Sequence, residues 1–346
     1  MSNGAVSEVV AKVEAELSAF WAASADDGGQ PKARAATMNF IAVSVPAEVD
    51  RLRASVEDLA QTRAGRAFIV TLDGRLAPWA LESDVSAVCH KEGDTLVCYD
   101  RIELHFGAGA AVRARSVISA LSLSEVPTIV EIGRSAPAPL VDALVKSADR
   151  IIVDSAHTSA VRIAEIADKT SAPLGDRAFV RTFSWREFTA RFFDEAPGAE
   201  RAIGRVEIER TTTERGDPAA LLLGWLAARL GWRFESRARA VDAQGMPVEI
   251  VVRAPVGKDL HAGEISAIRI TTAIDNRPLF CEVERNDGER CVSWTMSGPR
   301  ASRHNHPLGF RDEGWVLLKA IDSTEGDGVY RAAVLAAAEW AKGAER

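Results

Sequence analysis

Apolar residues along the chain recur with two different periods, which predict where helices give way to strands. Over residues 7–20, and again from Pro46 to residue 60, apolar positions recur every three or four residues, as on one face of a helix. Pro46 suits the first turn of the second helix. Between these segments, residues 22–36 are rich in Gly, Asp and Ala, which favours a loose linker.

From residue 66 the pattern changes to short apolar runs. Residues 67–72, 85–90 and 95–106 predict strands, and the last two are joined by a turn that favours an antiparallel pair. Further on, strands alternate with helices, the strands at 128–132 and 151–154 and the helices at 110–123, 139–146 and 159–168. This alternation predicts an α/β fold with three layers and a mixed sheet.

The second half follows another order, typical of an α+β domain with a mainly antiparallel sheet. We expect a long helix at 218–230, helices at 313–321 and 330–342, and strands at 205–209, 248–253, 264–272, 279–285 and 290–296. A chain of 346 residues is too long for one ordinary core. We therefore expect N-terminal helices and a linker (1–61), an α/β domain (62–195) and an α+β domain (196–346).

The composition is that of a globular protein, with 47% hydrophobic and 26% charged residues. The formal charge of −7 lacks the basic excess of a nucleic-acid-binding protein. The longest apolar run, 218–228, falls short of the roughly 20 residues that span a bilayer, and the first residues do not resemble a signal peptide. We expect a cytoplasmic protein that binds neither nucleic acid nor membrane.

Four cysteines fit that compartment as buried, reduced thiols. Cys281 and Cys291 flank a predicted turn at 286–288, so they could lie near one another, and whether they are redox-active is left open. Cys89 and His90, together with Cys98, could suggest a metal site, but a fourth ligand at metal-site spacing is missing, so we expect no metal site.

Gly107 and Gly109 lie between a predicted strand and a predicted helix, and Glu131 ends the next predicted strand. This outline is that of a dinucleotide-binding turn, in which glycines let the backbone approach a pyrophosphate. Val112 replaces the third glycine, however, and the preceding strand is predicted to be antiparallel. These departures favour an ordinary glycine-rich turn.

Asp154, Ser155 and His157 follow a buried strand and could supply an acid, a nucleophile and a base. Ser155 could instead cap the next helix, with Asp154 beside the helix dipole. We favour the cap, because adjacent side chains at a strand end diverge.

Ser184 and Glu187 have capping-box spacing and predict the start of a helix that carries Trp185 and Arg186. Trp and Arg are enriched at interface hot spots, but Trp185 could equally fill the core. Farther along, the apolar helix ending at Trp232 contains Gly224, which would allow another backbone to come close, and stops at Gly231.

The segment from Arg300 to His306 is the one locally basic, His-bearing stretch, with Arg303 and His304 between. It could bind an anion or a protein partner, since Arg offers bidentate donors. The chain lacks the usual catalytic signatures, such as GxxxxGK[ST], GxSxG and HExxH. We therefore assign no catalytic, cofactor-binding or metal-binding residues.

Several blocks resemble, in order, the glucose-6-phosphate dehydrogenase assembly protein family, OpcA, over residues 60–235. They are Thr62-Arg63 with Arg66-Ala-Phe-Ile-Val70, Leu96-Val-Cys98-Tyr-Asp-Arg-Ile102, Arg150-Ile-Ile-Val-Asp154-Ser155, Arg181-Thr-Phe-Ser-Trp185-Arg186-Glu187 with Phe193-Asp194, and Leu221-Leu-Leu-Gly-Trp225-Leu-Ala-Ala-Arg229-Leu-Gly-Trp232.

The resemblance implies a non-catalytic partner that binds glucose-6-phosphate dehydrogenase and favours its active oligomer, supporting NADPH production by the oxidative pentose phosphate pathway. The candidates for partner contact are Trp185, Arg186, Arg300, Arg303, His304 and His306. The alternative is a nucleotide- or sugar-phosphate-binding protein, which could be an enzyme, that uses the Gly107–Gly109 turn and the Arg300–His306 loop. Self-association is left open.

Overall fold

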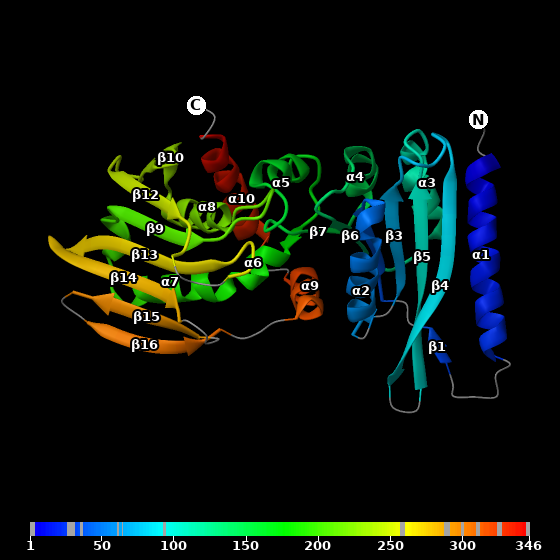
Figure 1. The fold of residues 1–346 in the computed structure, drawn as a ribbon, viewed down its shortest axis with the longest axis horizontal. Coiled ribbons are helices and arrows are strands. Elements are labelled where there is room, and N and C mark those ends of the chain that lie inside the picture. The colour runs from blue at the N-terminus through cyan, green and yellow to red at the C-terminus, as the bar shows by residue number, and fades with distance from the viewer. Residues whose placement is uncertain are drawn as a thin grey trace. The chain divides into compact units, whose positions relative to one another are not determined.

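A computed structural model of the chain describes residues 4–25, 32–34, 37–60, 62–63, 65–92, 95–256, 260–286, 291–298, 301–308, 312–323 and 327–343. The chain forms two compact units (Figure 1). The first comprises Met1–Val153, Lys169–Gly175 and Glu313–Asp322. The second comprises Asp154–Asp168, Asp176–Asp312 and Ser323–Arg346. Each unit therefore contains segments that are distant in the sequence.

The first unit is built on a mixed sheet, which confirms the predicted α/β fold. Its strands run in the order β1-β5-β3-β2-β6-β7-β8, and β4 pairs with β5 in antiparallel register. The strands are β1 (Lys32–Arg34), β2 (Asn39–Ser44), β3 (Arg66–Leu72), β4 (Leu81–Glu92), β5 (Thr95–Phe106), β6 (Thr128–Ile132), β7 (Arg150–Val153) and β8 (Leu174–Asp176).

Strand β2 is central to this sheet, although the sequence pattern did not predict it. All six of its residues are buried, and it pairs in parallel with β3 on one side and with β6 on the other. With β2 counted as the first strand of the parallel series, the order β5-β3-β2-β6-β7-β8 is 3-2-1-4-5-6. That is the strand order of doubly wound dinucleotide-binding folds, whose ligands lie where the order reverses.

Helices connect the strands of the first unit at the predicted places, with bounds shifted by a few residues. They are α1 (Gly4–Ala25), α2 (Val49–Ala60), α3 (Ala114–Leu121), α4 (Ala138–Leu144) and α9 (Glu313–Asp322), and short 3₁₀ turns at Pro46–Glu48 and Ala110–Arg113 precede α2 and α3. The predicted linker at 22–36 falls mostly outside the described residues. Of its described part, 22–25 end α1 and Lys32–Arg34 form β1.

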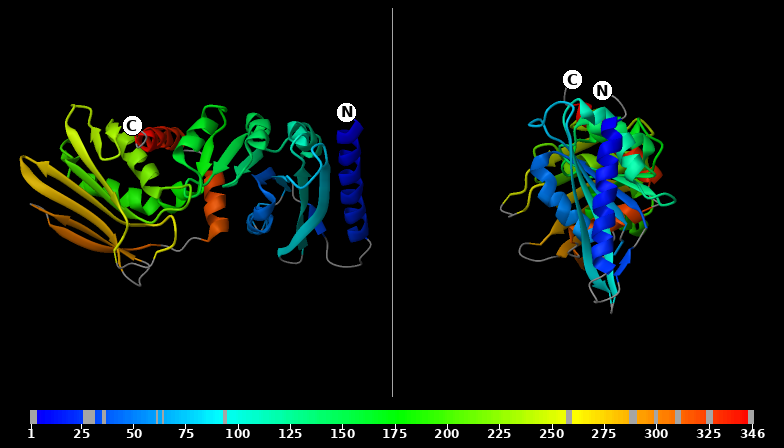
Figure 2. Two further views of the ribbon diagram at one scale, coloured as in Figure 1. Left: turned by 45° about the horizontal axis from the view of Figure 1, so that its top comes forward. Right: turned by 90° about the vertical axis from the view of Figure 1, so that its right-hand side faces the viewer.

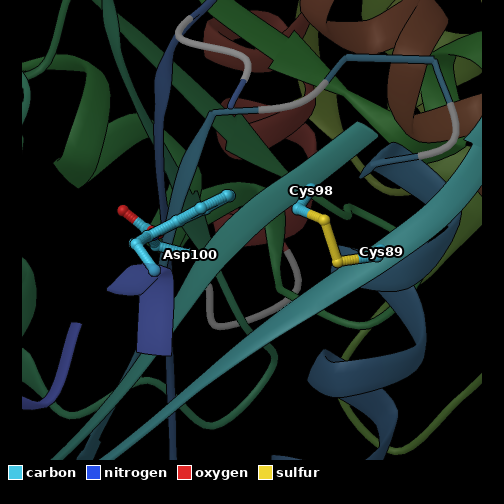
Figure 3. The surroundings of a disulfide bond; sticks show 4 residues. Cys89, Cys98 and Asp100 are labelled. Atoms are coloured by element: carbon cyan, nitrogen blue, oxygen red, sulfur yellow. A yellow bond between two sulfur atoms is a disulfide. The ribbon is translucent and has the colours of Figure 1, made fainter. Parts of the chain in front are cut away.

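A disulfide between Cys89 and Cys98 joins the long hairpin of β4 and β5 (Figure 3). The antiparallel register places these residues directly opposite each other, with their Cα atoms 4.0 Å apart. The expectation of four reduced thiols is therefore wrong for this pair. Cys281 lies opposite Met296 in its sheet, and Cys281 and Cys291 form no disulfide.

The second unit is built on a mainly antiparallel sheet, as predicted. The order is β10-β11-β12-β9-β13-β14-β15-β16, and only β9 and β12 pair in parallel. The strands are β9 (Arg205–Arg210), β10 (Arg233–Ser236), β11 (Arg239–Val241), β12 (Pro247–Arg253), β13 (Ile265–Ile274), β14 (Arg277–Arg285), β15 (Cys291–Ser297) and β16 (Ser302–Pro307). Most of the predicted turn at 286–288 lies outside the described residues.

The helices of the second unit lie on one face of its sheet (Figures 1 and 2). They are α5 (Ala160–Ala167), α6 (Arg177–Arg181), α7 (Phe183–Glu195), α8 (Pro218–Leu230) and α10 (Asp327–Lys342). Of these, α5 and α6 pack mainly against other helices. Helices α8 and α10 pack closely because a Cβ on Gly224 would lie only 2.1 Å from the carbonyl oxygen of Ala333. Gly231 ends α8 with φ +70°, so both predicted glycine roles are confirmed.

Candidate functional site

The point where the strand order of the first sheet reverses lies between β2 and β6, where a fold of this kind would bind a dinucleotide. The chain leaves β2 through Ser44-Val45-Pro46-Ala47-Glu48 and enters α2. None of these five residues is glycine. A side chain at each position keeps the backbone from approaching a pyrophosphate as a glycine-rich turn does.

An acidic side chain of the protein itself occupies this turn. The Glu48 carboxylate accepts a hydrogen bond from the Ser44 hydroxyl at 2.7 Å and from the Arg51 guanidinium at 3.1 Å. Arg134, which follows β6, lies 3.6 Å from the same carboxylate. The N-terminal turn of a helix favours a negative charge, and here Glu48 provides it.

The end of β6 packs closely against the end of β2. Gly133 follows β6, and a Cβ at this position would lie 2.7 Å from the Ser44 hydroxyl oxygen and 2.8 Å from the Val43 carbonyl oxygen. The two strand ends therefore abut. A phosphate group would have to displace Glu48 and would meet its charge.

The glycines predicted to form a phosphate-binding turn have a packing role. A Cβ on Gly107 would lie 2.1 Å from the Ala77 carbonyl oxygen, and one on Gly109 would lie 3.0 Å from the Trp79 ring. They follow β5 and not β2, so they lie away from the reversal point. Glu131, the acidic residue of that outline, is buried within β6.

Two carboxylates in the second unit bind their neighbours through a dense polar network. Asp154 is held by a bidentate pair with Arg181, both contacts being 3.0 Å. Asp176 accepts hydrogen bonds from the Tyr330 hydroxyl at 2.7 Å and from the backbone N–H of Ala178 at 2.8 Å and of Ser155 at 3.1 Å. All these residues come from segments of the same unit.

The environments of the two carboxyl groups push their pKa values in opposite directions. Burial would raise the pKa of Asp154, but the Arg181 guanidinium outweighs it and lowers that pKa overall. Burial, and then the charge of Asp154, raises the pKa of Asp176. Such a divergence is found in acid–base pairs, yet here each carboxyl group is engaged by the protein: Asp154 by Arg181 and Asp176 as the cap of α6.

The predicted cap at Ser155 is wrong. Helix α5 begins later, and its cap is Ser159, whose hydroxyl accepts from the Arg162 N–H at 3.3 Å. Residues 154–158 form a turn first, with the Thr158 N–H donating to the Asp154 carbonyl oxygen at 2.9 Å. In the other reading of this strand end, an acid, nucleophile and base trio, Asp154 would be the acid; in the structure, its carboxylate accepts two hydrogen bonds from Arg181.

Trp185 and Arg186 do not lie on the surface. Their exposed fractions are 4% and 8%, and the Arg186 guanidinium carbon lies 3.4 Å from the centroid of the Phe179 ring. Burial lowers the pKa of Arg186 to about 9. The predicted capping box at Ser184 is also wrong, because Asp176 caps the preceding helix α6 and α7 follows it directly from Thr182.

The basic stretch predicted as a loop is an edge strand, β16, which pairs with β15 only. Arg303 and His304 are exposed on it, and Arg300 lies outside the described residues. His306 stacks on Phe188 with ring centroids 4.7 Å apart. Burial, followed by the charge of Arg191, lowers the pKa of His306. The sequence analysis identified these residues as one basic stretch, but it did not predict that they form a strand.

The polar face of the second sheet carries an ion-pair network that the sequence pattern did not predict. Glu207 and Glu209 are 8% and 7% exposed, and both bind Arg253 and Arg269 at 2.6–3.0 Å. The signal in the sequence was the alternation of charge with apolar residues along β9. A cavity of about 220 Å³ is lined by Glu207 and Arg269 of this network, together with neighbouring residues of the sheet that include Arg205 and Glu282.

In the described parts of the chain, no helix has the length and apolar character to cross a membrane. Within those same parts, no group of three or more His, Cys, Asp or Glu residues is placed to hold a metal ion.

Two family models match the chain, and both describe a glucose-6-phosphate dehydrogenase subunit. The model of its N-terminal domain matches residues 56–168, and the model of its C-terminal domain matches residues 172–334. Together they account for most of the chain.

Two curated proteins are also similar, and both carry the name "Putative OxPP cycle protein OpcA". The one from Nostoc punctiforme is 33% identical over 168 residues, covering 44% of this chain and 35% of that protein. The one from Synechococcus elongatus is 27% identical over 221 residues, covering 56% and 48%. The matched regions thus span only about a third to a half of these relatives.

Among solved structures, a 3-ketoreductase from Actinomadura kijaniata covers 89% of this chain and 98% of its own, with a TM-score of 0.46 and 11% identity. An oxidoreductase from Sinorhizobium meliloti gives a TM-score of 0.43 and 13% identity, covering 88% and 89%. Values this low support no inference about activity. The two family models follow each other in the order of the resembling blocks and together match most of the chain: the chain belongs to the glucose-6-phosphate dehydrogenase assembly protein family, OpcA.

Proposed function

We propose that this protein is a non-catalytic partner of glucose-6-phosphate dehydrogenase that favours the active oligomer of that enzyme. Membership of the family supports the association, since its two models are described as domains of a glucose-6-phosphate dehydrogenase subunit. In this role the protein supports NADPH production by the oxidative pentose phosphate pathway, in the cytoplasm with the enzyme.

The proposal that the protein is non-catalytic rests on one observation. Protein groups occupy the place between β2 and β6 where the strand order reverses. A dehydrogenase built on this strand order holds its dinucleotide there, with a pyrophosphate at the helix N-terminus. In this chain Glu48 fills that position and is fixed by Ser44 and Arg51. A carboxylate in the phosphate position argues for a protein that assists a dehydrogenase and does not bind the dinucleotide in the usual way.

Activation follows from differential affinity. If the protein binds the active oligomer more tightly than the inactive form, it shifts the equilibrium between them by that difference in binding free energy. A preference of about 1.4 kcal/mol changes the ratio of the two forms tenfold. No residue of the protein then has to enter the active site of the enzyme.

Strand β16 is the surface we propose for docking. Of the candidate contact residues, Arg303 and His304 are exposed there and His306 is half-buried, whereas Trp185 and Arg186 are buried. Arg300 remains a candidate from sequence alone. An edge strand offers unpaired backbone groups, and exposed basic side chains would direct it to an acidic surface of the enzyme.

A matched pair of variants tests this surface. Arg303→Glu reverses a charge on β16, and Arg233→Glu makes the same change on β10, the opposite edge of the same sheet. We expect R303E to weaken binding to the purified enzyme about tenfold or more, mainly through slower association, and R233E to leave it unchanged. Equal affinities of the two variants, measured by surface plasmon resonance at two salt concentrations, would place the docking surface elsewhere.

The alternative of one nucleotide or sugar-phosphate site built from the Gly107–Gly109 turn and the Arg300–His306 segment finds no support in the geometry. The glycines pack against residues 77–79, and the basic residues are carried by a strand. The two groups also belong to different units.

A further inference from the structure

A cavity in the first unit lies beside α1 and has a volume of about 320 Å³. Its apolar wall is formed by Val6 and Val9 of α1, Leu81 at the start of β4, and Trp79. The size falls within the range of small-molecule sites. None of the residues discussed for the docking surface contributes to it.

Trp79 is the unusual member of this wall, because its side chain is large, apolar and 54% exposed. The backbone around it is fixed by two hydrogen bonds, from the Gly107 N–H to the Ala80 carbonyl oxygen and from the Ala110 N–H to the Pro78 carbonyl oxygen, both 2.9 Å. Gly109 lets the ring lie against the turn. A half-exposed indole held in this way is a ready platform for a flat ring.

Two cations and one acid share the rim of the same cavity. The Arg113 guanidinium carbon lies 5.6 Å from the centroid of the Trp79 ring, within the range of a cation–π contact. Lys12 lines the cavity from α1 and reaches the Ser83 hydroxyl at 3.3 Å. Glu8 is the carboxylate in this lining. The rim thus carries two cations and the Glu8 carboxylate, and Lys12 also lies 3.8 Å from the Glu16 carboxylate on α1.

We infer that this cavity binds a planar anion of mononucleotide size. In this site the base stacks on Trp79, the phosphate interacts with Arg113 and Lys12, and an exocyclic amine of the base suits Glu8 as an acceptor. The inference goes beyond the proposed function and does not rest on it, since binding is measured on the isolated protein.

The experiment uses AMP as the probe, with adenosine and ribose 5-phosphate as its two halves. Isothermal titration calorimetry on the full chain should show saturable AMP binding with a Kd below about 1 mM and binding at least tenfold weaker for each half. Absence of AMP binding at that concentration would overturn the inference. Equal affinity for ribose 5-phosphate and AMP would overturn the stacking role of Trp79.

Two variants and a matched control locate the site. Trp79→Ala and Arg113→Gln should each weaken AMP binding about tenfold or more, because one removes the stacking surface and the other a charge-assisted contact. Arg115→Gln makes the same charge change on α3 at an exposed residue outside the cavity lining, and it should leave the affinity unchanged. If R113Q and R115Q bind AMP alike, the ligand lies elsewhere. Thermal melts of each variant report folding separately.

Discussion

Gly224 shows how far one missing side chain determines packing in the second unit. A Cβ there would lie 2.1 Å from the Ala333 carbonyl oxygen and 2.7 Å from the Ala337 backbone nitrogen, so α8 and α10 can approach this closely only at glycine. We expect Gly224→Ala to destabilise the protein by about 1–3 kcal/mol, because the helices must separate.

Its control is Gly328→Ala, at a glycine of α10 with no atom within 4 Å of the added Cβ. That change should be neutral or stabilise by up to about 1 kcal/mol through helix propensity. Urea unfolding of both variants distinguishes the two cases. Equal stabilities would mean that α8 and α10 are not packed as described.

Asp154 gives the second unit a pH dependence. Its pKa is lowered in the folded protein, so it contributes stability that is present above its unfolded value, about 3.9, and is lost as the pH falls through the folded value. Asp154→Asn removes this contribution and leaves Arg181 without its carboxylate partner. We expect a loss of about 2 kcal/mol at pH 7 and a flatter fall in stability below about pH 4.

The comparison for Asp154 is Glu165→Gln, which removes an exposed partner of Arg162 on α5. That variant should change stability by less than about 1 kcal/mol and keep the acid-dependent fall of the native protein. Thermal melts between pH 3 and pH 7 measure this dependence. If the stability of D154N falls with decreasing pH as steeply as that of the native protein, the Asp154–Arg181 pair does not cause the acid dependence.

At the scale of elements, the disulfide joins β4 to β5 across a short loop. Oxidised protein should expose two thiols on denaturation, those of Cys281 and Cys291. The variant with both Cys89→Ser and Cys98→Ser should lose about 2–3 kcal/mol of stability, the value expected for closing a loop of this length. Cys291→Ser serves as the control. Four titratable thiols in protein purified without reductant would contradict the cross-link.

The elements that the sequence predicted well are those whose surroundings impose a periodic pattern. Helix α8 was predicted with its observed bounds, because it is apolar and enclosed by Asp217, Pro218 and Gly231. Strand β2 was missed because a fully buried strand has no alternation to detect and is short. Strand β16 was missed because an edge strand of polar residues resembles a loop.

The candidate site could be predicted only in part for the same reason. Because β2 was not predicted, the glycine-rich turn after β5 was the segment most similar to a dinucleotide-binding turn. For the same reason, the position of Glu48 after the central strand could not be inferred. Trp185 and Arg186 were equally compatible with a core and with an interface from sequence alone, and burial in the folded unit decides for the core. The register of the β4–β5 hairpin places Cys89 directly opposite Cys98, and this register was not worked out from the sequence.

At the scale of the whole molecule, the strand order of doubly wound folds is combined with a glycine-free turn after β2, where the Ser44 hydroxyl donates to Glu48, in a chain of the OpcA family. In our proposal, such a protein acts through contact with glucose-6-phosphate dehydrogenase. Its effect on glucose-6-phosphate dehydrogenase should therefore saturate at a fixed ratio of the two proteins.

The most direct test is a titration of purified glucose-6-phosphate dehydrogenase with this protein, following the initial rate of NADPH formation and the sedimentation of the complex in the same samples. We predict a rate that rises and then saturates, together with a larger species that contains both proteins, and no NADPH formation by this protein alone. An unchanged rate with two separately sedimenting proteins would contradict the proposed function.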